Sequence, residues 1–146
     1  MKIAVACDHG AFEYKEIVKE MISEMGHEVQ DFGCFGLESV DYPDYAGPAA
    51  KSVADGKNDR AIVICGTGIG VSISANKIKG IRCALCSDCV SAKLTREHNN
   101  SNVLAMGQRI IGVELMKEIV RIWVNTAFSN DPRHQRRIDK IAALEE

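Results

Sequence analysis

The feature that most constrains the fold is a regular alternation of short β-type apolar runs with longer segments of helical period. The runs are, in chain order, KIAVAC (2–7), EVQDF (28–32), RAIVIC (60–65), IRCALC (81–86) and NVLAM (102–106). The first, third and fourth runs are apolar almost throughout, which is typical of strands covered on both faces. Five strands, each followed by a helix, predict a five-stranded parallel sheet in a doubly wound, three-layer αβα sandwich.

The segments between the runs predict the helices. Apolar residues recur on one helical face from 12 to 25, and Gly26 ends that stripe. Further helices are expected across 44–54, from about 70, over 90–97 and across 112–128. In the tail, from about 130 to 146, Asp131 is placed as an N-cap and Pro132 as the first helical residue. We expect this last helix to pack against a partner subunit.

Length and charge exclude several classes of protein. The 146 residues are expected to form one domain, and the formal net charge of -2 argues against a general affinity for nucleic acid or anionic membrane. No apolar run approaches the roughly 20 residues that span a bilayer, and the start, MKIAVACDHG, becomes polar too early for a signal peptide. We therefore expect a cytoplasmic protein that binds a small molecule or another protein.

The six cysteines are expected to be reduced thiols. Cys83, Cys86 and Cys89 form a C-x-x-C-x-x-C run, which raises the question of a metal or iron–sulfur site. The familiar ferredoxin spacing needs a fourth thiolate at Lys93, and side chains three apart on a strand point to opposite faces. We predict that these thiols pack as small hydrophobic groups and that no metal is bound.

A cysteine followed by alternate glycines, CGTGIG (65–70), ends the third run. In open parallel sheets, ligands bind at the carboxyl ends of the strands. Alternate glycines leave backbone amides free at a helix start, where they favour a phosphate, a carboxylate or a developing oxyanion. A thiolate at the same helix start is stabilised and is able to attack a carbon or remove a proton. The alternative is a cysteine that only packs at the end of a buried strand.

Nucleotide-binding motifs are the main alternative interpretation of this glycine loop. The Gly-Lys-Ser/Thr ending of a P-loop is absent. Asp88 lies 20 residues after Gly68, where a ribose-binding acid would stand, but Val71 occupies the place of the third glycine of the dinucleotide fingerprint. A non-catalytic nucleotide-binding module therefore stays open as an alternative, as does a redox-sensing thiol protein.

Polar side chains near the strand ends supply partners for the thiol. Asp8 and His9 follow the first strand, and Arg109 lies just beyond the fifth. His98 and Asn99 come just before the fifth strand, so they reach the same edge of the sheet only if the chain bends back there.

The last helix carries Arg133 and Arg137, four residues apart on one face. Such a pair suits a phosphate dianion, and a solvated basic helix is the alternative. An amide loop that binds anions, a thiolate base, a histidine acid and an arginine clamp together fit proton transfer beside the carbonyl of a phosphorylated substrate.

Five segments together resemble the family that holds ribose-5-phosphate isomerase B and the galactose-6-phosphate isomerase subunits. They are CDHGAFEYK, DYPDYA, CGTGIGVSISANKIKGIRCAL, REHNNSNVLAMGQR and RHQRRIDKI, and they cover essentially the whole chain. The resemblance implies a Rossmann-like sandwich, a homodimer or homotetramer with active sites shared between two subunits, and no metal or other cofactor. It also implies interconversion of D-ribose 5-phosphate and D-ribulose 5-phosphate through a cis-enediolate, in the non-oxidative pentose phosphate pathway.

The same resemblance implies a role for each matching residue. Cys65 is the base that moves a proton between C1 and C2, Thr67 assists transfer between the oxygens, and His98 is the proton donor in ring opening. The substrate-binding residues are Asp8, His9, Tyr42, Gly66, Thr67, Gly68, Ile69, Gly70, Asn99, Arg109, Arg133 and Arg137. Within that set the three arginines bind the phosphate, part of them from the partner subunit, and the amides of the glycine loop hold the oxyanion.

Two features narrow the substrate within the family. One branch uses a glutamate in the helix after the loop, and this chain has Val71 there, so it resembles the cysteine branch. The cysteine loop, the histidine and the arginine pair stand in one chain, which favours a self-sufficient homo-oligomer acting on a pentose phosphate. An isomerase of a six-carbon sugar phosphate, such as allose 6-phosphate or galactose 6-phosphate, is the alternative.

Overall fold

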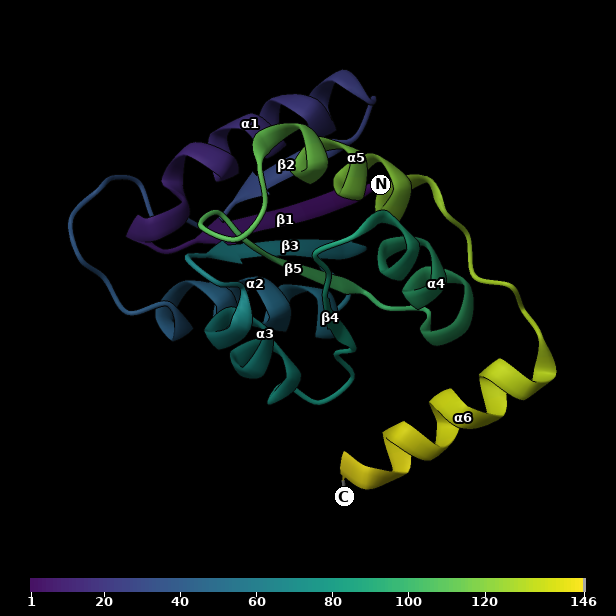
Figure 1. The fold of residues 1–146 in the computed structure, drawn as a ribbon. Helices are drawn as coiled ribbons and strands as arrows, with labels where there is room; N and C mark the ends of the chain where they lie inside the picture. The colour runs from purple at the N-terminus through teal and green to yellow at the C-terminus, as the bar shows by residue number, and fades with distance from the viewer. Residues whose placement is uncertain (146) are drawn as a thin grey trace.

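The apolar runs form the central sheet of the computed structural model, which describes residues 1–145. In these residues the sheet has five strands in the order β2-β1-β3-β5-β4 (Figure 1). Their bounds are β1 Lys2–Cys7, β2 Glu28–Asp31, β3 Arg60–Cys65, β4 Cys83–Leu85 and β5 Val103–Gly107. Every neighbouring pair is parallel, which confirms the predicted sheet.

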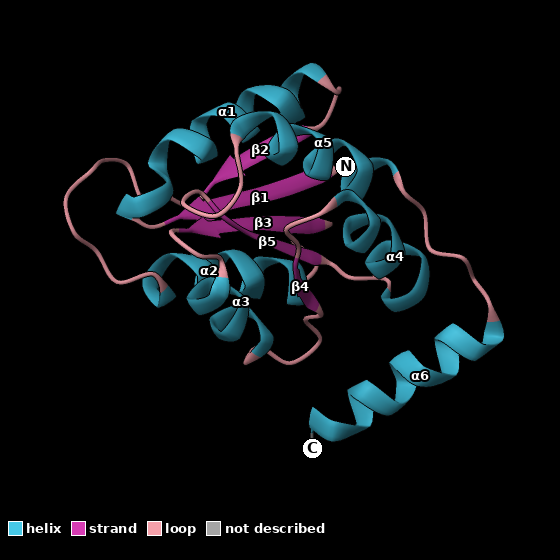
Figure 2. Cartoon of the chain, in the orientation of Figure 1, coloured by secondary structure: helices cyan, strands magenta, loops and turns pink. Residues whose placement is uncertain are grey.

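Helices cover both faces of the sheet (Figure 2). One face carries α1 (Phe12–Glu24), α4 (Cys89–Asn99) and α5 (Val113–Asn125), and the other carries α2 (Pro43–Ala54) and α3 (Ile69–Asn76). The α6 helix (Pro132–Ala142) follows an extended segment and lies away from the sandwich, with contacts to α4. Short 3-10 helices stand at His9–Ala11 and Ala143–Glu145. None of the helices within residues 1–145 is long and apolar enough to cross a membrane.

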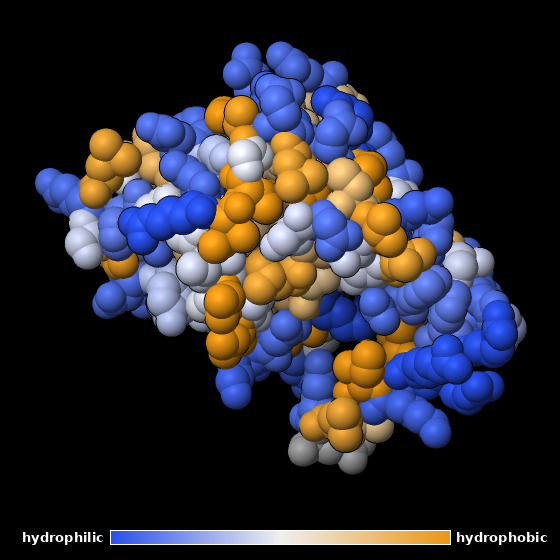
Figure 3. All heavy atoms as spheres, in the orientation of Figure 1, coloured by the Kyte–Doolittle hydropathy of each residue, from blue (hydrophilic) through white to orange (hydrophobic). Residues whose placement is uncertain are grey.

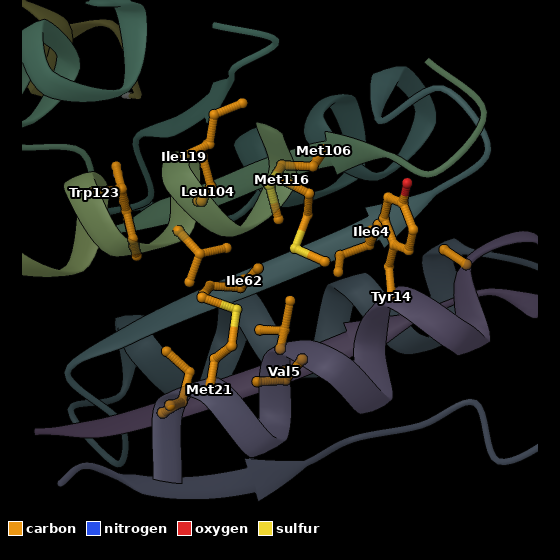
Figure 4. Close-up of a cluster of buried hydrophobic side chains, with 14 of the residues drawn as sticks. Val5, Tyr14, Met21, Ile62, Ile64, Leu104, Met106, Met116, Ile119 and Trp123 are labelled. Carbon is orange, nitrogen blue, oxygen red and sulfur yellow. The ribbon is translucent and has the colours of Figure 1, made fainter. Parts of the chain in front are cut away.

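The two faces of the sheet are packed with side chains of different size. The face under α1 and α5 buries large groups such as Ile62, Met116 and Trp123 (Figure 4). The face under α2 and α3 is built mainly of alanine and valine, including Ala4 and Ala49. Small side chains allow close packing of helix on strand, so α3 and the loop that precedes it lie directly against the sheet.

The cysteine run divides between these two cores, as predicted. Cys83 packs against the alanine-rich core, whereas Cys86 is buried in the core on the opposite face. Burial raises the pKa of Cys83 to about 12 and that of Cys86 to about 11, so both are protonated thiols at neutral pH. Their packing on opposite faces of the sheet agrees with the interpretation of these two residues as packing groups.

Three predicted boundaries differ from the structure by two or more residues. The fourth strand is only Cys83–Leu85 because β4 is an edge strand with β5 as its one partner. The α5 helix ends at Asn125, not at 128. The α4 helix runs to Asn99, beyond the predicted 97, and closes on Asn100, which adopts the left-handed conformation (φ 45°, ψ 47°) that often follows a helix. His98 and Asn99 therefore lie in the last turn of α4.

Candidate active site

The loop between β3 and α3 presents the Cys65 thiol to its own backbone. Cys65 is 5% exposed, and its Sγ accepts a hydrogen bond from the N–H of Gly68 at 3.1 Å. Gly68 has φ +80°, and a Cβ there would lie 2.7 Å from the carbonyl carbon of Met106. Only glycine fits this turn, which aims an amide and the start of α3 at the sulfur. A thiolate at this position keeps the same bond and faces the positive end of the helix.

The residues at the end of β5 hold the loop between β3 and α3 in place. A Cβ on Gly107 would lie 2.4 Å from the carbonyl carbon of Thr67, so the two backbones are in direct contact. The N–H of Gln108 donates to the Cys65 oxygen, and the N–H of Arg109 donates to the Gly66 oxygen, both at 2.9 Å. These contacts bring Arg109 beside the glycine loop, where its side chain lies next to Gly66.

The end of β1 joins the same site. Asp8 is 8% exposed and caps the 3-10 helix that follows, with its Oδ1 accepting from the N–H of Gly10 at 2.9 Å. A Cβ on Gly10 would lie 3.3 Å from that oxygen, 3.6 Å from Arg109 Nη2 and 3.6 Å from the nitrogen of Gly66. Asp8, Gly66 and Arg109 thus converge around Gly10.

The segment between β2 and α2 closes over this edge. The N–H of Val40 donates to Nδ1 of His9 at 3.1 Å. The Tyr42 ring lies so close to Gly70 that a Cβ there would be 2.5 Å from it. In the loop itself, the Thr67 hydroxyl accepts from the N–H of Ile69 at 3.2 Å.

We call this group the carboxyl-end cluster. It consists of Asp8, His9, Tyr42, Cys65, Gly66, Thr67, Gly68, Ile69, Gly70 and Arg109. The structure therefore brings together the thiol, the amide loop, one carboxylate and one arginine of the predicted site. Together these groups supply a base, hydrogen-bond donors for an oxyanion and a positive charge.

The remaining predicted residues lie on α4 and α6, which are in contact at the opposite edge. The Asn99 oxygen accepts from Nε of Arg82, the residue just before β4, at 2.9 Å. The His98 ring lies 4.4 Å from that of His134 on α6, between ring centroids. Arg133 binds Asp131 at 2.9 Å, and this bond lowers the pKa of Asp131 to about 2. We call His98, Asn99, Arg133, His134 and Arg137 the amino-end cluster.

The direction of α4 explains why the two clusters are apart. The helix starts after the carboxyl end of β4 and returns the chain to the amino end of β5. Its 11 residues, at about 1.5 Å each, cover roughly 16 Å. Since the chain does not bend back after α4, His98 and Asn99 of one chain do not reach Cys65 of the same chain.

Two other residues are clarified by their hydrogen bonds. Asp88, the candidate ribose-binding acid, caps α4 by accepting from the N–H of Ser91 at 2.7 Å and from its hydroxyl at 2.8 Å. This capping accounts for an acid at that position without a nucleotide. His134 was not predicted, although it stands next to Arg133 in the basic tail; its Nδ1 lies 2.7 Å from the hydroxyl of Ser129.

Comparison with known proteins gives one consistent family. A model of the Ribose/Galactose Isomerase family matches residues 3–141. The putative sugar phosphate isomerase YwlF of Bacillus subtilis is 56% identical over 147 residues, covering 100% of this chain and 98% of that protein. Ribose-5-phosphate isomerase B of Escherichia coli is 47% identical over 145 residues, covering 99% and 97%.

A solved structure agrees with these relatives. Ribose-5-phosphate isomerase B of Clostridium thermocellum superimposes with a TM-score of 0.97 at 46% identity, covering 99% of this chain and 97% of that one. The match includes the sheet, both helical layers and the loop that carries the thiol, since it extends over nearly the whole of both chains. The chain therefore belongs to the ribose/galactose isomerase family.

Proposed function

We propose that this protein is an aldose–ketose isomerase that interconverts D-ribose 5-phosphate and D-ribulose 5-phosphate. The observation that carries the proposal is the Cys65 sulfur held 3.1 Å from the Gly68 amide at the start of α3, inside the glycine-rich loop of residues 65–70. Family membership and the relatives that act on ribose 5-phosphate support the same substrate. The enzyme would serve the non-oxidative pentose phosphate pathway in the cytoplasm, where free thiols such as its six cysteines persist.

The chemistry follows from the groups in the two clusters. His98 donates a proton to the ring oxygen, the bond from that oxygen to C1 breaks, and the C1 hydroxyl gives its proton to a solvent water molecule, which leaves an aldehyde at C1. The Cys65 thiolate then removes the proton on C2, and the electrons move to O1 to give a cis-enediolate. Thr67 assists transfer of the O2 proton to O1, and Cys65 returns its proton to C1. The amides of residues 66–70 stabilise the negative oxygen.

The other residues bind the substrate. Asp8 holds the ring oxygen or a hydroxyl, His9 and Asn99 contact the sugar, and Tyr42 forms a wall of the pocket. The phosphate is bound by Arg109, Arg133 and Arg137.

A complete site needs two copies of the chain, because each copy has its two clusters at opposite edges. We propose a homodimer, or a pair of dimers, in which the amino-end cluster and α6 of one copy meet the carboxyl-end cluster of the other. Exposed apolar side chains next to the carboxyl-end cluster support this association, and Figure 3 shows such side chains gathered on one face. They include Ile69 (51% exposed), Ile73 (56%) and Ile110 (57%).

Substrate class is tested by steady-state kinetics without added metal or cofactor. We expect kcat/KM to be highest for ribose 5-phosphate and much lower for allose 6-phosphate and galactose 6-phosphate. A preference for either six-carbon sugar would replace the pentose assignment, and no turnover of any of the three would overturn the isomerase assignment.

The shared site is tested by mixing two inactive variants, Cys65→Ala and His98→Ala. In a mixed dimer one site contains both substitutions and the other contains neither, so the second site works. Equal mixing and exchange of subunits should restore about a quarter of the wild-type activity for a two-fold symmetric dimer. Mixing either variant with itself is the control, and no recovery in the mixed sample would show that each chain works alone.

A further inference from the structure

Two arginines surround the end of α4 without using a carboxylate. Arg96, only 4% exposed, donates from Nε to the oxygen of Thr126 at 3.0 Å and from Nη1 to Asn100 Oδ1 at 2.9 Å and to the oxygen of Ser101. Arg82 donates from Nε to the oxygen of Asn99 at 2.9 Å and from Nη2 to that of Asn100 at 3.0 Å. Every hydrogen bond that these two guanidinium groups make within residues 1–145 ends on an amide or peptide oxygen.

The arrangement is electrostatically demanding. Burial, together with the positive charges of Arg60 and Arg82, lowers the pKa of Arg96 to about 10. A buried guanidinium is tolerated only when its donors are satisfied, and here the backbone oxygens of Thr126 and Ser101 and the side-chain oxygen of Asn100 accept from Arg96. Burying the Arg96 guanidinium costs free energy, and its hydrogen bonds fix the path of the chain after His98.

The bonds immobilise the turn that holds the proposed proton donor. Helix ends commonly fray by one or two residues. In this chain Arg82 holds the oxygens of Asn99 and Asn100, while Arg96, one turn earlier, holds the Ser101 oxygen and the Asn100 side chain. His98 lies between these anchors on an exposed helix end, so its direction depends on them.

Arg96 also holds the base of the segment that leads to α6. Thr126 is the residue directly after α5, and the N–H of Ser129 in the same segment donates to the oxygen of Glu97 at 3.2 Å. The α6 helix buries only Ile138 among its own residues. A cavity of about 290 Å³, lined in part by Arg82, Asn99 and Ile141, lies where α6 passes β4 and α4. With so little packing, the position of α6 depends strongly on where its leading segment starts.

We propose that Arg96, assisted by Arg82, is a positioning residue that sets the spacing between His98 and the α6 arginines Arg133 and Arg137. One side chain is bonded to both segments, so it couples the proton donor to the phosphate clamp. The inference rests on the proposed function, in which the ring oxygen and the phosphate of one substrate must be reached together. Proton donation by the amino-end cluster needs that spacing, whereas proton abstraction by Cys65 does not.

The test separates ring opening from proton abstraction. Ribose 5-phosphate enters as a ring, whereas ribulose 5-phosphate is acyclic, and exchange of its C1 hydrogen with D2O needs Cys65 but no ring opening. In Arg96→Lys, which keeps the charge and loses the planar fork, we expect kcat for ribose 5-phosphate to fall by about tenfold to a hundredfold and KM to rise. Exchange at saturating ribulose 5-phosphate should stay within about twofold of wild type. Equal loss in both assays, or no loss in either, would overturn the proposal.

Amide hydrogen exchange provides a readout that does not depend on the reaction. Arg96→Lys should speed exchange in residues 98–102 and in residues 126–131 together, whereas Arg82→Met, at a half-buried position, should affect only the first segment. Arg121→Met, which removes an exposed arginine paired with Glu118 on α5, is the control and should leave both unchanged. If Arg96→Lys does not fold, Arg82→Met still tests the proposal. It should slow turnover of ribose 5-phosphate more than it slows exchange of the C1 hydrogen of ribulose 5-phosphate with D2O. If the wild-type protein turned over no ribose 5-phosphate, the proposed function would be refuted. Amide hydrogen exchange would then still test whether Arg96 couples residues 98–102 to residues 126–131.

Discussion

The carboxyl-end cluster is positioned by backbone, whereas the amino-end cluster is positioned by long side chains. Around Cys65, glycines let main chain approach main chain, as at Gly68 against Met106 and Gly107 against Thr67. Around His98, the guanidinium groups of Arg82 and Arg96 bridge separate segments. The carboxyl-end cluster is therefore held rigidly by backbone contacts, whereas in the amino-end cluster arginine side chains hold a helix end that faces solvent.

The difference matches the chemistry proposed for each cluster. An oxyanion is best stabilised by dipoles that are already in place, because reorganising them during the reaction would consume the benefit. A proton donor and a phosphate clamp on exposed surface must keep their spacing without a surrounding core, and charged hydrogen bonds can supply that. Substitutions in the two clusters should therefore fail in different ways.

The largest effect is expected from removing the thiol. Cys65→Ala should lower kcat for ribose 5-phosphate by about 10³-fold or more, because the general base is lost while the amides remain. Calorimetry should still detect sugar phosphate binding at near wild-type affinity. Cys86→Ala, which removes a thiol buried in the opposite core, is the matched control and should keep nearly full activity. Full activity in Cys65→Ala would refute its assignment as the base.

The next largest effect is expected where backbone meets backbone. In Gly107→Ala the new methyl group would lie 2.4 Å from a carbonyl carbon of Thr67, which has no flexible end to move. Displacing the loop should reduce kcat by about a hundredfold, and overpacking should lower the free energy of unfolding by about 1–3 kcal/mol. Gly47→Ala, within α2 where nothing lies within 4 Å of the new Cβ, should be neutral or slightly stabilising. Kinetics and urea denaturation of both variants measure the contrast.

Much of the carboxyl-end cluster could be predicted from sequence because it depends on local patterns. The apolar runs predict where the strands end, and the alternate glycines predict a loop whose backbone lies close to neighbouring groups. The positions of Asp8, Cys65 and Arg109 at one edge follow from the rule that parallel strands share a carboxyl end. Tyr42 is predicted only from the family resemblance, as part of the pocket wall, because the loop between β2 and α2 has no hydrophobic period; its contact with Gly70 is seen only in the structure.

The amino-end cluster could be predicted only in part. The polar stretch after Glu97 looks like a loop, but Asn100 in the left-handed conformation and the arginine bonds extend α4 through Asn99. Arg96 appears in the sequence as one more charge on an amphipathic helix; its burial and its bond to Thr126 depend on contacts far along the chain. Such roles have no local signal, which is also why His134 was missed.

Lys15 is a long side chain on which the carboxyl-end cluster also depends. This lysine is fully buried; its Nζ donates to Asp31 at 2.7 and 2.8 Å and to the oxygen of Cys34 at 2.7 Å, at the root of the segment that reaches His9 and Tyr42. Lys15→Met leaves Asp31 with Lys19 alone. We expect a loss of about 3 kcal/mol in the free energy of unfolding at pH 7, because a buried pair is broken, and only a several-fold loss of kcat.

The pH dependence of this loss can be checked separately. Partial burial alone would raise the pKa of Asp31, but hydrogen bonds from Lys15 and Lys19 outweigh it and the net pKa is lowered. A lowered folded-state pKa gives stability that is present above the unfolded pKa of about 3.9 and lost as the pH falls through the folded pKa. The gap in urea midpoint between wild type and Lys15→Met should therefore be larger at pH 7 than at pH 3. Lys51→Met, which breaks an exposed pair with Asp55, should show little change at either pH.

The smallest effect on activity is expected from the thiols of the core, and it sharpens the contrast with Cys65. With pKa values of about 12 and about 11, Cys83 and Cys86 are almost entirely protonated at neutral pH, and they pack on opposite faces of the sheet. A Cys83→Ala/Cys86→Ala variant should keep kcat within about twofold, and the lost packing should cost about 1–2 kcal/mol of stability. In the wild type, iodoacetamide at pH 7.5 should label Cys65 before these two residues, and ribose 5-phosphate should protect it. Faster labelling at Cys83 or Cys86, with parallel loss of activity, would mean that the reactive thiol lies in the cysteine run and not in the glycine loop.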